Sequence, residues 1–354
     1  MKKVSITELS PKQLQDFLTE KGEKPYRAKQ IIDWLYHKPV ESFEAISNIP
    51  PKLRQELADE FAFRSLEPVT EKTSKDGETT KTLFRLADGH TIESVLMRYH
   101  KRHTVCVSSQ VGCAFGCPLC VTGVSGFERN LTPAEIIDQV LYFSRKLKAA
   151  DKAVTNVVFM GMGEPMTNFE AVWKAIECFT ADNLLNIGAR HITISTAGIP
   201  PGIRKLAKKN LQIGLAISLH APDNALRDQL VPPNKMYPLE VLIPACREYI
   251  EATNRRITFE YALISRVNDT IPQAIALANL LRGINCYVNL IPANASANPE
   301  LVASSKARTQ IFSDTLAKHH VANTVRLARG TDIEAGCGQL RARILEAQAE
   351  KLSK

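Results

Sequence analysis

The sequence contains one dense group of residues that could bind a metal centre. Cys113, Cys117 and Cys120 form a C-x3-C-x2-C pattern, and no fourth ligand follows in the same loop. Thiolates are the soft ligands that hold iron–sulfur clusters in proteins. Three thiolates on a four-iron cluster would leave one iron open, and an open iron can bind a substrate. The glycines and the proline inside this stretch suit a loop that curls until three side chains point at one centre.

Three other interpretations of this cysteine pattern are open from its spacing. A structural zinc site usually has four closed protein ligands, so a distant His or Cys would have to complete the set. Cysteines can also be buried apolar fillers, but three of them beside two glycines and a proline are poor core composition. A disulfide framework is not expected in a chain of 354 residues without a secretory signal. The zinc site is therefore the main rival to a cluster.

Two further motifs contain polar residues at the ends of apolar runs. Gly163 and Glu164 follow an apolar strand in the motif G-M-G-E-P. Glycine lets the backbone approach a ligand closely, and a carboxylate can pair with an ammonium group, although the motif by itself is more often a turn. His220 in S-L-H-A-P is, by itself, a histidine at a strand end.

The remaining cysteines lie outside the C-x3-C-x2-C pattern. Cys106 precedes it and Cys337 lies near the C-terminus between two glycines. Taken alone, these two are ordinary thiols. Cys178, Cys246 and Cys286 lie in apolar helix or strand patterns, so we assign them to the core.

From about Thr104 the sequence alternates between strand and helix patterns. Apolar runs of strand length occur at residues 104–109, 156–161, 191–196, 213–219, 256–264 and 286–292. Helices are expected at residues 131–143, 169–179, 239–250 and 271–281. The first of these helices begins with Thr132 as N-cap, Pro133 at the first position and Glu135 at the third. This alternation predicts a parallel sheet, open or closed into a barrel, with the chemistry at the carboxyl ends of the strands.

The first 90 residues predict a small helical domain. Ser10 and Pro11 indicate the start of its first helix. Basic side chains lie beside aromatic ones here, namely Lys24, Arg27, Lys29, His37 and Lys38 with Tyr26, Trp34 and Tyr36. Such a mixture can hold RNA by phosphate contact and stacking, or it can be an aromatic core with a solvated lysine face.

The segment before the cysteines predicts a short β structure. Residues 68–104 alternate apolar and polar positions, which indicates a hairpin turned at residues 87–89. Glu93 lies in the second strand and, taken alone, is a surface carboxylate. The basic run R-Y-H-K-R-H at residues 98–103 could steer an RNA backbone towards the cysteines.

Composition is that of a globular protein with a sizeable core. Of the 354 residues, 44% are hydrophobic and 23% are charged. Neither an apolar leader nor a run of about 18 apolar residues occurs, so we expect a cytoplasmic protein without a membrane span. The net charge of +8 fits a polyanionic partner such as nucleic acid, although a solvated basic surface without a partner explains it as well.

Seven motifs follow one another along nearly the whole chain. They are C-V-S-S-Q-V-G-C-A-F-G-C-P-L-C-V-T-G (106–123), R-N-L-T-P-A-E-I-I-D-Q-V (129–140), G-M-G-E-P-M (161–166), I-S-T-A-G (194–198), S-L-H-A-P (218–222), N-L-I-P-A-N (289–294) and G-T-D-I-E-A-G-C-G-Q-L (330–340). In these motifs the sequence resembles the RlmN/Cfr family of RNA methyltransferases, which belongs to the radical S-adenosylmethionine (SAM) superfamily. The resemblance implies an α/β fold, namely a partial (βα)6 radical-SAM barrel, open on one side, with a small N-terminal helical domain.

The resemblance also implies domain limits and cofactors. It places an RNA-engaging accessory domain with a short β linker at residues 1–90, the catalytic barrel at 91–345 and a tail at 346–354. It implies one 4Fe–4S cluster and two molecules of S-adenosyl-L-methionine per turnover. The implied cluster ligands are Cys113, Cys117 and Cys120, and the implied cofactor contacts are Gly163, Glu164, Ser195, Ser218, Leu219, His220 and Asn294.

In the family, catalysis depends on Cys337, Cys106 and Glu93 at the matching positions. Cys337 is expected to accept a methyl group from a first S-adenosylmethionine by ordinary displacement. A 5′-deoxyadenosyl radical from a second one removes a hydrogen atom from this methyl group, and the methylene radical adds to an adenine carbon. Glu93 is expected to accept the ring proton. The Cys106 thiolate then attacks the Cys337 sulfur, which releases methyladenine and leaves a disulfide.

The resemblance implies RNA partners and leaves other classes open. The expected substrates are 23S ribosomal RNA and, as a further candidate, transfer RNA. The F-E-R-N-L element favours the RlmN branch, which methylates carbon 2 of adenosine, over a Cfr-like carbon-8 enzyme that confers antibiotic resistance. A flavodoxin-type reductase as electron donor and a monomeric state are also expected. A glycyl-radical activase, which needs neither Cys106 nor Cys337, and a zinc-bearing RNA-binding protein remain the alternatives.

Overall fold

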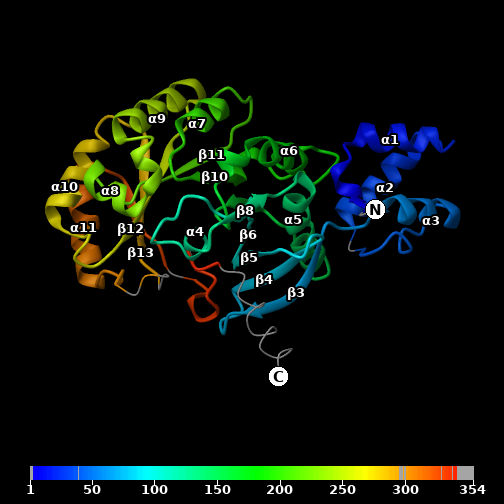
Figure 1. Ribbon diagram of the computed structural model, residues 1–354, viewed down its shortest axis with the longest axis horizontal. Coiled ribbons are helices and arrows are strands. Elements are labelled where there is room, and N and C mark those ends of the chain that lie inside the picture. Colours follow the sequence, from blue (N-terminus) through cyan, green and yellow to red (C-terminus); the bar gives the residue numbers. More distant parts are fainter. Residues whose placement is uncertain are drawn as a thin grey trace.

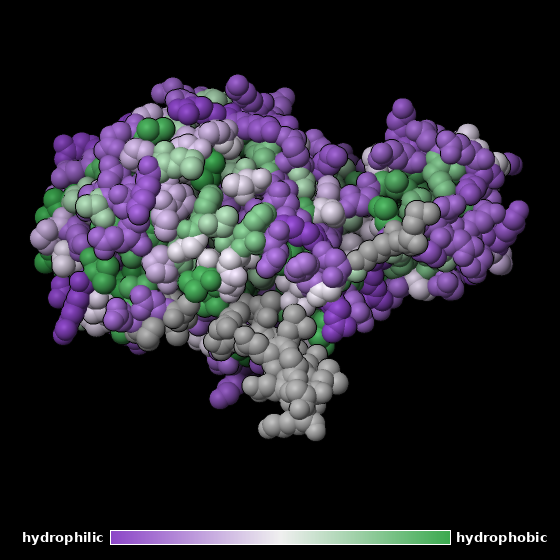
Figure 2. Space-filling model, viewed as in Figure 1, coloured by the Kyte–Doolittle hydropathy of each residue, from purple (hydrophilic) through white to green (hydrophobic). Residues whose placement is uncertain are grey.

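A computed structural model of the chain describes residues 3–38, 40–294, 298, 300–327, 329–336 and 338–340. It has a small helical lobe and a larger α/β body, which lie side by side (Figure 1). The surface of the lobe is mostly hydrophilic, whereas hydrophobic residues gather in patches over the middle of the body (Figure 2). Within the described residues, no helix has the length and apolar character that crossing a membrane requires.

The N-terminal lobe is helical, as predicted. It contains α1 (Pro11–Glu20), α2 (Tyr26–His37), α3 (Pro51–Glu60), the 3-10 helix η1 (Ile6–Glu8) and the paired strands β1 (Val4–Ser5) and β2 (Phe61–Ala62). The start of α1 has the physical basis expected from Ser10 and Pro11. The Ser10 side chain accepts from the Gln13 N–H, and the Gln13 side chain accepts from the Ser10 N–H.

A buried carboxylate is one of the groups that join the lobe to the body. Asp138 on α5 (Pro133–Lys148) accepts hydrogen bonds from the Thr7 hydroxyl at 3.1 Å and from the Ser65 N–H at 2.6 Å. Burial raises the pKa of Asp138, since these donors only partly replace its lost hydration. The lobe therefore rests on the first barrel helix at a fixed point.

One ten-stranded sheet forms the body. Its strands are β3 (Leu66–Thr73), β4 (Thr79–Leu86), β5 (Thr91–Tyr99), β6 (Arg102–Cys106), β9 (Asn156–Phe159), β10 (Ile192–Thr196), β11 (Gly214–Ser218), β12 (Ile257–Leu263), β13 (Cys286–Pro292) and β14 (Asn323–Val325). The order is β14-β13-β12-β11-β10-β9-β6-β5-β4-β3. From β6 to β14 all neighbours are parallel, whereas β3, β4 and β5 continue the sheet as an antiparallel meander. Within the described residues β14 and β3 remain edges, so the barrel is partial, as predicted.

Helices follow the parallel strands and cover the outside of the sheet (Figure 1). They are α5, α6 (Phe169–Thr180), α7 (Pro200–Ala207), α8 (Asn224–Leu230), α9 (Leu239–Thr253), α10 (Ile271–Leu280) and α11 (Lys306–Lys318), and a short α4 (Val121–Val124) lies in the cysteine loop. The predicted capping box at Thr132 and Glu135 starts α5. Strand residues such as Val157, Phe259 and Val288 are fully buried, and each such side chain contributes roughly 1.5–3 kcal/mol.

The hairpin predicted before the cysteines is present, because β4 and β5 pair on either side of a turn at residues 87–90. It does not stand apart from the barrel, since β5 pairs with β6. The proposed domain limit at residue 90 therefore lies inside a continuous sheet.

Candidate active site

The three clustered cysteines lie in the loop between β7 (Gln110–Gly112) and α4. Gly112 has φ +73°, and a side chain there would collide with the Gly126 carbonyl oxygen, so this turn requires glycine. Cys113, Cys117 and Cys120 all line one cavity of about 220 Å³. Their convergence agrees with the curled loop expected from the sequence.

The electrostatic state of these thiols favours a cationic partner. Burial, with added repulsion from Glu164 and neighbouring cysteines, raises the pKa of Cys113 to about 11 and that of Cys117 to about 12. Cys113 and Cys117 would thus stay protonated without a cation, whereas a bound metal deprotonates the thiols that ligate it. Among the described residues, no three His, Cys, Asp or Glu side chains are grouped for a single metal ion. Three thiols are the soft donor set that an iron–sulfur cluster takes.

The cavity lies at the carboxyl ends of the parallel strands, where the sequence placed the chemistry. Besides the cysteines, six predicted cofactor residues line it, namely Gly163, Glu164, Ser195, Ser218, His220 and Asn294. The seventh, Leu219, is fully buried, and the residues that line the cavity do not include it. Leu219 is part of the wall that supports its neighbours, since its N–H donates to the Glu260 carbonyl at 3.0 Å.

Glu164 is held as a buried acceptor in this cavity. Its carboxylate accepts from the Met166 N–H at 2.9 Å and from the Ala197 N–H at 2.8 Å. Burial raises the pKa of Glu164 to about 7, and an ammonium group bound beside it would favour the ionised form. Gly163 has φ +95°, and a side chain there would collide with Gln110. The glycine is thus required to bring the backbone close to Gln110.

His220 is a neutral residue at the end of β11. Its φ is +60°, and its Nδ1 accepts from the Ala262 N–H at 3.0 Å. Burial and the nearby Arg227 lower the pKa of His220 to about 3. An accepting Nδ1 on a neutral ring assigns the proton to Nε2, so the side chain offers the cavity a hydrogen-bond donor.

Sequence reasoning missed three charged residues around the cavity. Arg227 is fully buried and donates to the Ala197 carbonyl at 2.6 Å and the Leu219 carbonyl at 3.2 Å, which ties two strand ends together. Glu260 and Arg326 line the cavity as an ion pair at 3.7 Å. A glutamate inside the apolar run R-I-T-F-E-Y was a usable signal for Glu260. Nothing local distinguishes Arg227.

Cys106 and Glu93 lie on the adjacent strands β6 and β5. Cys106 ends β6 and is 8% exposed, and Glu93 on β5 is 5% exposed. Glu93 is therefore a buried carboxylate, and the alternative of a surface carboxylate is wrong. Val95 pairs directly with Cys106, and Glu93 lies two positions along the same strand, so both residues face one side of the sheet. Neither lines the cysteine cavity.

Cys337 lies outside the described residues. Its chain neighbours contact the cysteine loop, since the Val121 N–H donates to the Gly338 carbonyl at 2.8 Å. The Thr122 hydroxyl donates to the Leu340 carbonyl at 2.8 Å. Gly338 and Leu340 also line the cavity. The C-terminal segment thus comes back to the site that the cysteines form.

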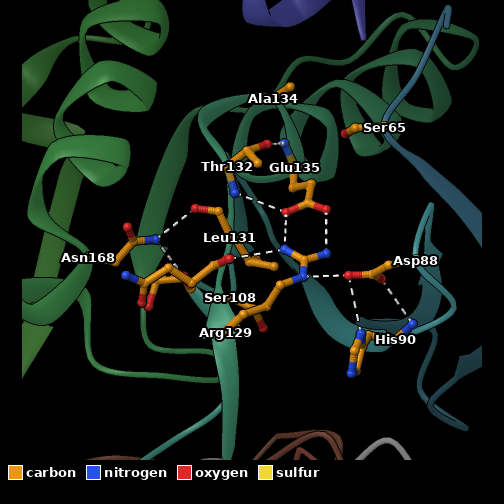
Figure 3. Close-up of polar contacts among 12 residues, drawn as sticks. Ser65, Asp88, His90, Ser108, Arg129, Leu131, Thr132, Ala134, Glu135 and Asn168 are labelled. Atoms are coloured by element: carbon orange, nitrogen blue, oxygen red, sulfur yellow. Dashed lines mark hydrogen bonds and ion pairs between the residues drawn. The ribbon is translucent and has the colours of Figure 1, made fainter. Parts of the chain in front are cut away.

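A charged network fixes the strand after the cysteines (Figure 3). Arg129 on β8 (Phe127–Asn130) donates two hydrogen bonds of 2.8 Å to Glu135 and one of 2.5 Å to Asp88. Glu135 also accepts from the Thr132 N–H at 2.9 Å, so one side chain serves both helix cap and ion pair. The network joins the F-E-R-N-L element, the start of α5 and the β4–β5 turn.

Comparisons with known proteins agree with this architecture. Residues 4–62 match the model of the ribosomal RNA large subunit methyltransferase N-terminal domain, and residues 107–278 match the radical SAM superfamily. A crystal structure of a radical SAM methyltransferase from Sphaerobacter thermophilus superimposes with a TM-score of 0.94 at 46% identity, covering 96% of this chain and 100% of that one. Fold and site therefore define a radical SAM methyltransferase. Membership of this superfamily implies a 4Fe–4S cluster and S-adenosylmethionine as cofactors.

Curated relatives narrow the assignment further. A probable dual-specificity RNA methyltransferase RlmN from Bacillus pumilus is 46% identical over 339 residues, which cover 96% of this chain and 94% of the relative. One of the same name from Staphylococcus aureus is 44% identical over 348 residues, covering 98% and 95%. The chain belongs to the RlmN family of RNA methyltransferases.

Proposed function

We propose that this enzyme methylates carbon 2 of an adenosine in 23S ribosomal RNA and in transfer RNA. The observation that carries the proposal is the gathering of three thiols, Glu164 and the C-terminal segment around one cavity at the strand ends. The relatives are named dual-specificity RNA methyltransferases, which supports an RNA substrate and two kinds of RNA. That name does not favour the Cfr-like alternative, and the family match does not favour an activase or a zinc-bearing binding protein.

Cys113, Cys117 and Cys120 would hold the cluster, and Glu164 with its glycine neighbours would hold the amino end of S-adenosylmethionine. When bound, these groups would supply a methyl group, one electron and a radical able to remove a hydrogen atom. His220 would donate from Nε2 and Ser195, Ser218 and Asn294 would add polar contacts.

The chain's own residues would carry the methyl group to RNA. Cys337 would receive it and present it to the adenine ring. Glu93 would accept the proton that leaves the ring carbon, for which a buried carboxylate is suited. The unpaired electron of the adduct would return to the oxidised cluster. Cys106 would then attack the Cys337 sulfur and break its bond to the methylene carbon, which would take up a proton as the methylated base leaves and the two cysteines form a disulfide. The common face of Glu93 and Cys106 in the β5–β6 ladder supports their action on one intermediate.

Mass spectrometry of nucleosides tests this function directly. We expect the reconstituted enzyme to convert an RNA fragment and S-adenosylmethionine with a deuterated methyl group into 2-methyladenosine, with part of the label moved to 5′-deoxyadenosine. Cys337→Ala is expected to form no methyladenosine. Methylation at carbon 8 would assign the enzyme to the Cfr-like branch. Cleavage of S-adenosylmethionine by the wild type without RNA methylation would contradict the proposed reaction and support only a radical SAM enzyme.

We also propose a phosphate contact between the lobe and the body. A cavity of about 170 Å³ lies between α2 and α5, and no acidic residue is among those that line it. Its basic residues are His37, Lys38, Arg145, Lys148 and Lys152. Within the described residues, Nε and Nη2 of Arg145 are buried without a hydrogen-bond partner. A cavity lined by basic residues and no acidic ones suits the phosphates of an RNA backbone.

Salt-dependent RNA binding tests this contact. We expect the double variant Lys148→Gln and Lys152→Gln to bind an RNA stem-loop about tenfold more weakly at 0.1 M salt, because two phosphate contacts are lost. The slope of log affinity against log salt should fall by about one for each contact. The control is the double variant Lys208→Gln and Lys318→Gln, which removes two positive charges from exposed positions at the ends of other helices. Equal losses in both double variants would show that net charge alone acts.

We propose further that the enzyme is a cytoplasmic monomer that receives electrons from a flavodoxin-type reductase. Light scattering of the purified protein tests the monomeric state, and a dimer would contradict it. Cleavage of S-adenosylmethionine driven by a reduced flavodoxin tests the electron donor.

A further inference from the structure

Lys81 on β4 is a buried lysine with two partners. It is 8% exposed, and its Nζ lies 3.2 Å from Glu93 Oε1. The same Nζ donates to the Glu334 carbonyl at 3.1 Å. Lysine is almost never this buried unless it is paired, since a bare ammonium loses its hydration. One ammonium has three protons and can hold both partners together.

Strand register explains why Lys81 reaches Glu93. Lys81 pairs with Val95 on β5, and Val95 pairs with Cys106 on β6, so these three residues form one row across three strands. Directly paired residues face the same side of a sheet. Glu93 lies two positions from Val95 and shares that face. The sheet thus presents an ammonium, a carboxylate and a thiol side by side.

The segment ahead of Cys337 docks on the turn that leads into β4. Asp332 Oδ2 accepts from the Lys75 N–H at 2.9 Å, and Arg329 forms an ion pair with Glu78. Gly330 lies so close to Thr79 that an added Cβ would be 2.7 Å from its methyl group. The Lys81 contact with the Glu334 carbonyl is the last of this series, three residues before Cys337.

We propose that Lys81 is a positioning residue that holds the Glu93 carboxylate ionised and aimed at the reacting base while it anchors the segment that carries Cys337. The assignment rests on the proposed function, in which Glu93 accepts the ring proton. Removing one partner of a buried pair leaves the other charge uncompensated, and Glu93 would then favour its protonated form. A protonated carboxyl cannot accept the proton, so the covalent protein–RNA species would persist.

The test compares Lys81→Met with Lys81→Arg, which keeps the charge, and with Lys146→Met. Lys146 on α5 forms a more exposed ion pair with Glu71 of the same meander, and its variant controls for the loss of an ion-paired lysine. We expect Lys81→Met to lower kcat about a hundredfold with the KM for RNA within threefold, and to accumulate protein–RNA adduct on denaturing gels. Lys81→Arg should recover at least a tenth of the wild-type rate, and Lys146→Met should match the wild type.

The outcomes separate the two proposals. Adduct that accumulates in Lys81→Met, with iron content and thermal stability retained, supports the positioning role. A Lys81→Met variant that turns over normally, or loses activity only with its iron or its fold, overturns that role. A wild-type enzyme that forms no methyladenosine overturns the proposed function instead.

Discussion

Replacing Cys106 with alanine is expected to turn the enzyme into a protein that stays covalently bound to its RNA. The Cys106 thiolate is the proposed nucleophile that separates the Cys337 sulfur from the methylated base. Without this thiolate the earlier steps proceed, but no nucleophile releases the RNA from Cys337. We expect multiple turnover to fall by at least about a thousandfold, as when a nucleophile is removed. Denaturing gels with labelled RNA should show up to one RNA bound per protein.

The control for this variant is Cys286→Ala. Cys286 lies half-buried at the start of β13, and burial raises the pKa of its thiol to about 11, so it carries little thiolate at neutral pH. It should turn over at the wild-type rate without adduct. Release of methyladenosine by Cys106→Ala at the wild-type rate would assign the resolving role elsewhere.

Local sequence signals predicted the parts of the fold that local interactions determine. The helix start at Thr132 follows from side chains within four residues, and the structure confirms its capping box. The six expected strands are present because long apolar runs are buried wherever they lie in a sheet. The short strand β14 has only three residues and no such run, so no pattern indicated it.

Contacts between distant segments could not be predicted in this way. Whether Glu93 is exposed or a buried carboxylate depends on the register of β4 against β5, which places Lys81 next to it. That register comes from the packing of the whole sheet, so no local sequence pattern predicts the pair of Lys81 and Glu93. Arg227 is similar, because its partners are carbonyls of two strand ends that only the barrel brings together. The cysteine loop was predictable because its three cysteines lie within eight residues.

Replacing Cys117 with serine is expected to remove the iron and with it all cofactor cleavage and methylation. The Cys117 thiol is held among Cys113 and Cys120, and burial with their repulsion raises its pKa to about 12. This arrangement is costly unless a metal takes the thiolates. Serine offers a hard oxygen of still higher pKa, which soft iron–sulfide does not accept. Iron content should fall from about four atoms per chain to near zero, with loss of the brown colour.

Cys286→Ser separates loss of a ligand from loss of a thiol. Both thiols have a raised pKa, but Cys286 is not among the residues that line the cysteine cavity. We therefore expect Cys286→Ser to keep its iron, and both variants to keep the wild-type circular dichroism spectrum. Iron retained by Cys117→Ser would exclude this cysteine as a ligand. One zinc and no iron in the wild type would instead favour the zinc site, because a single ion needs a fourth ligand from elsewhere in the chain.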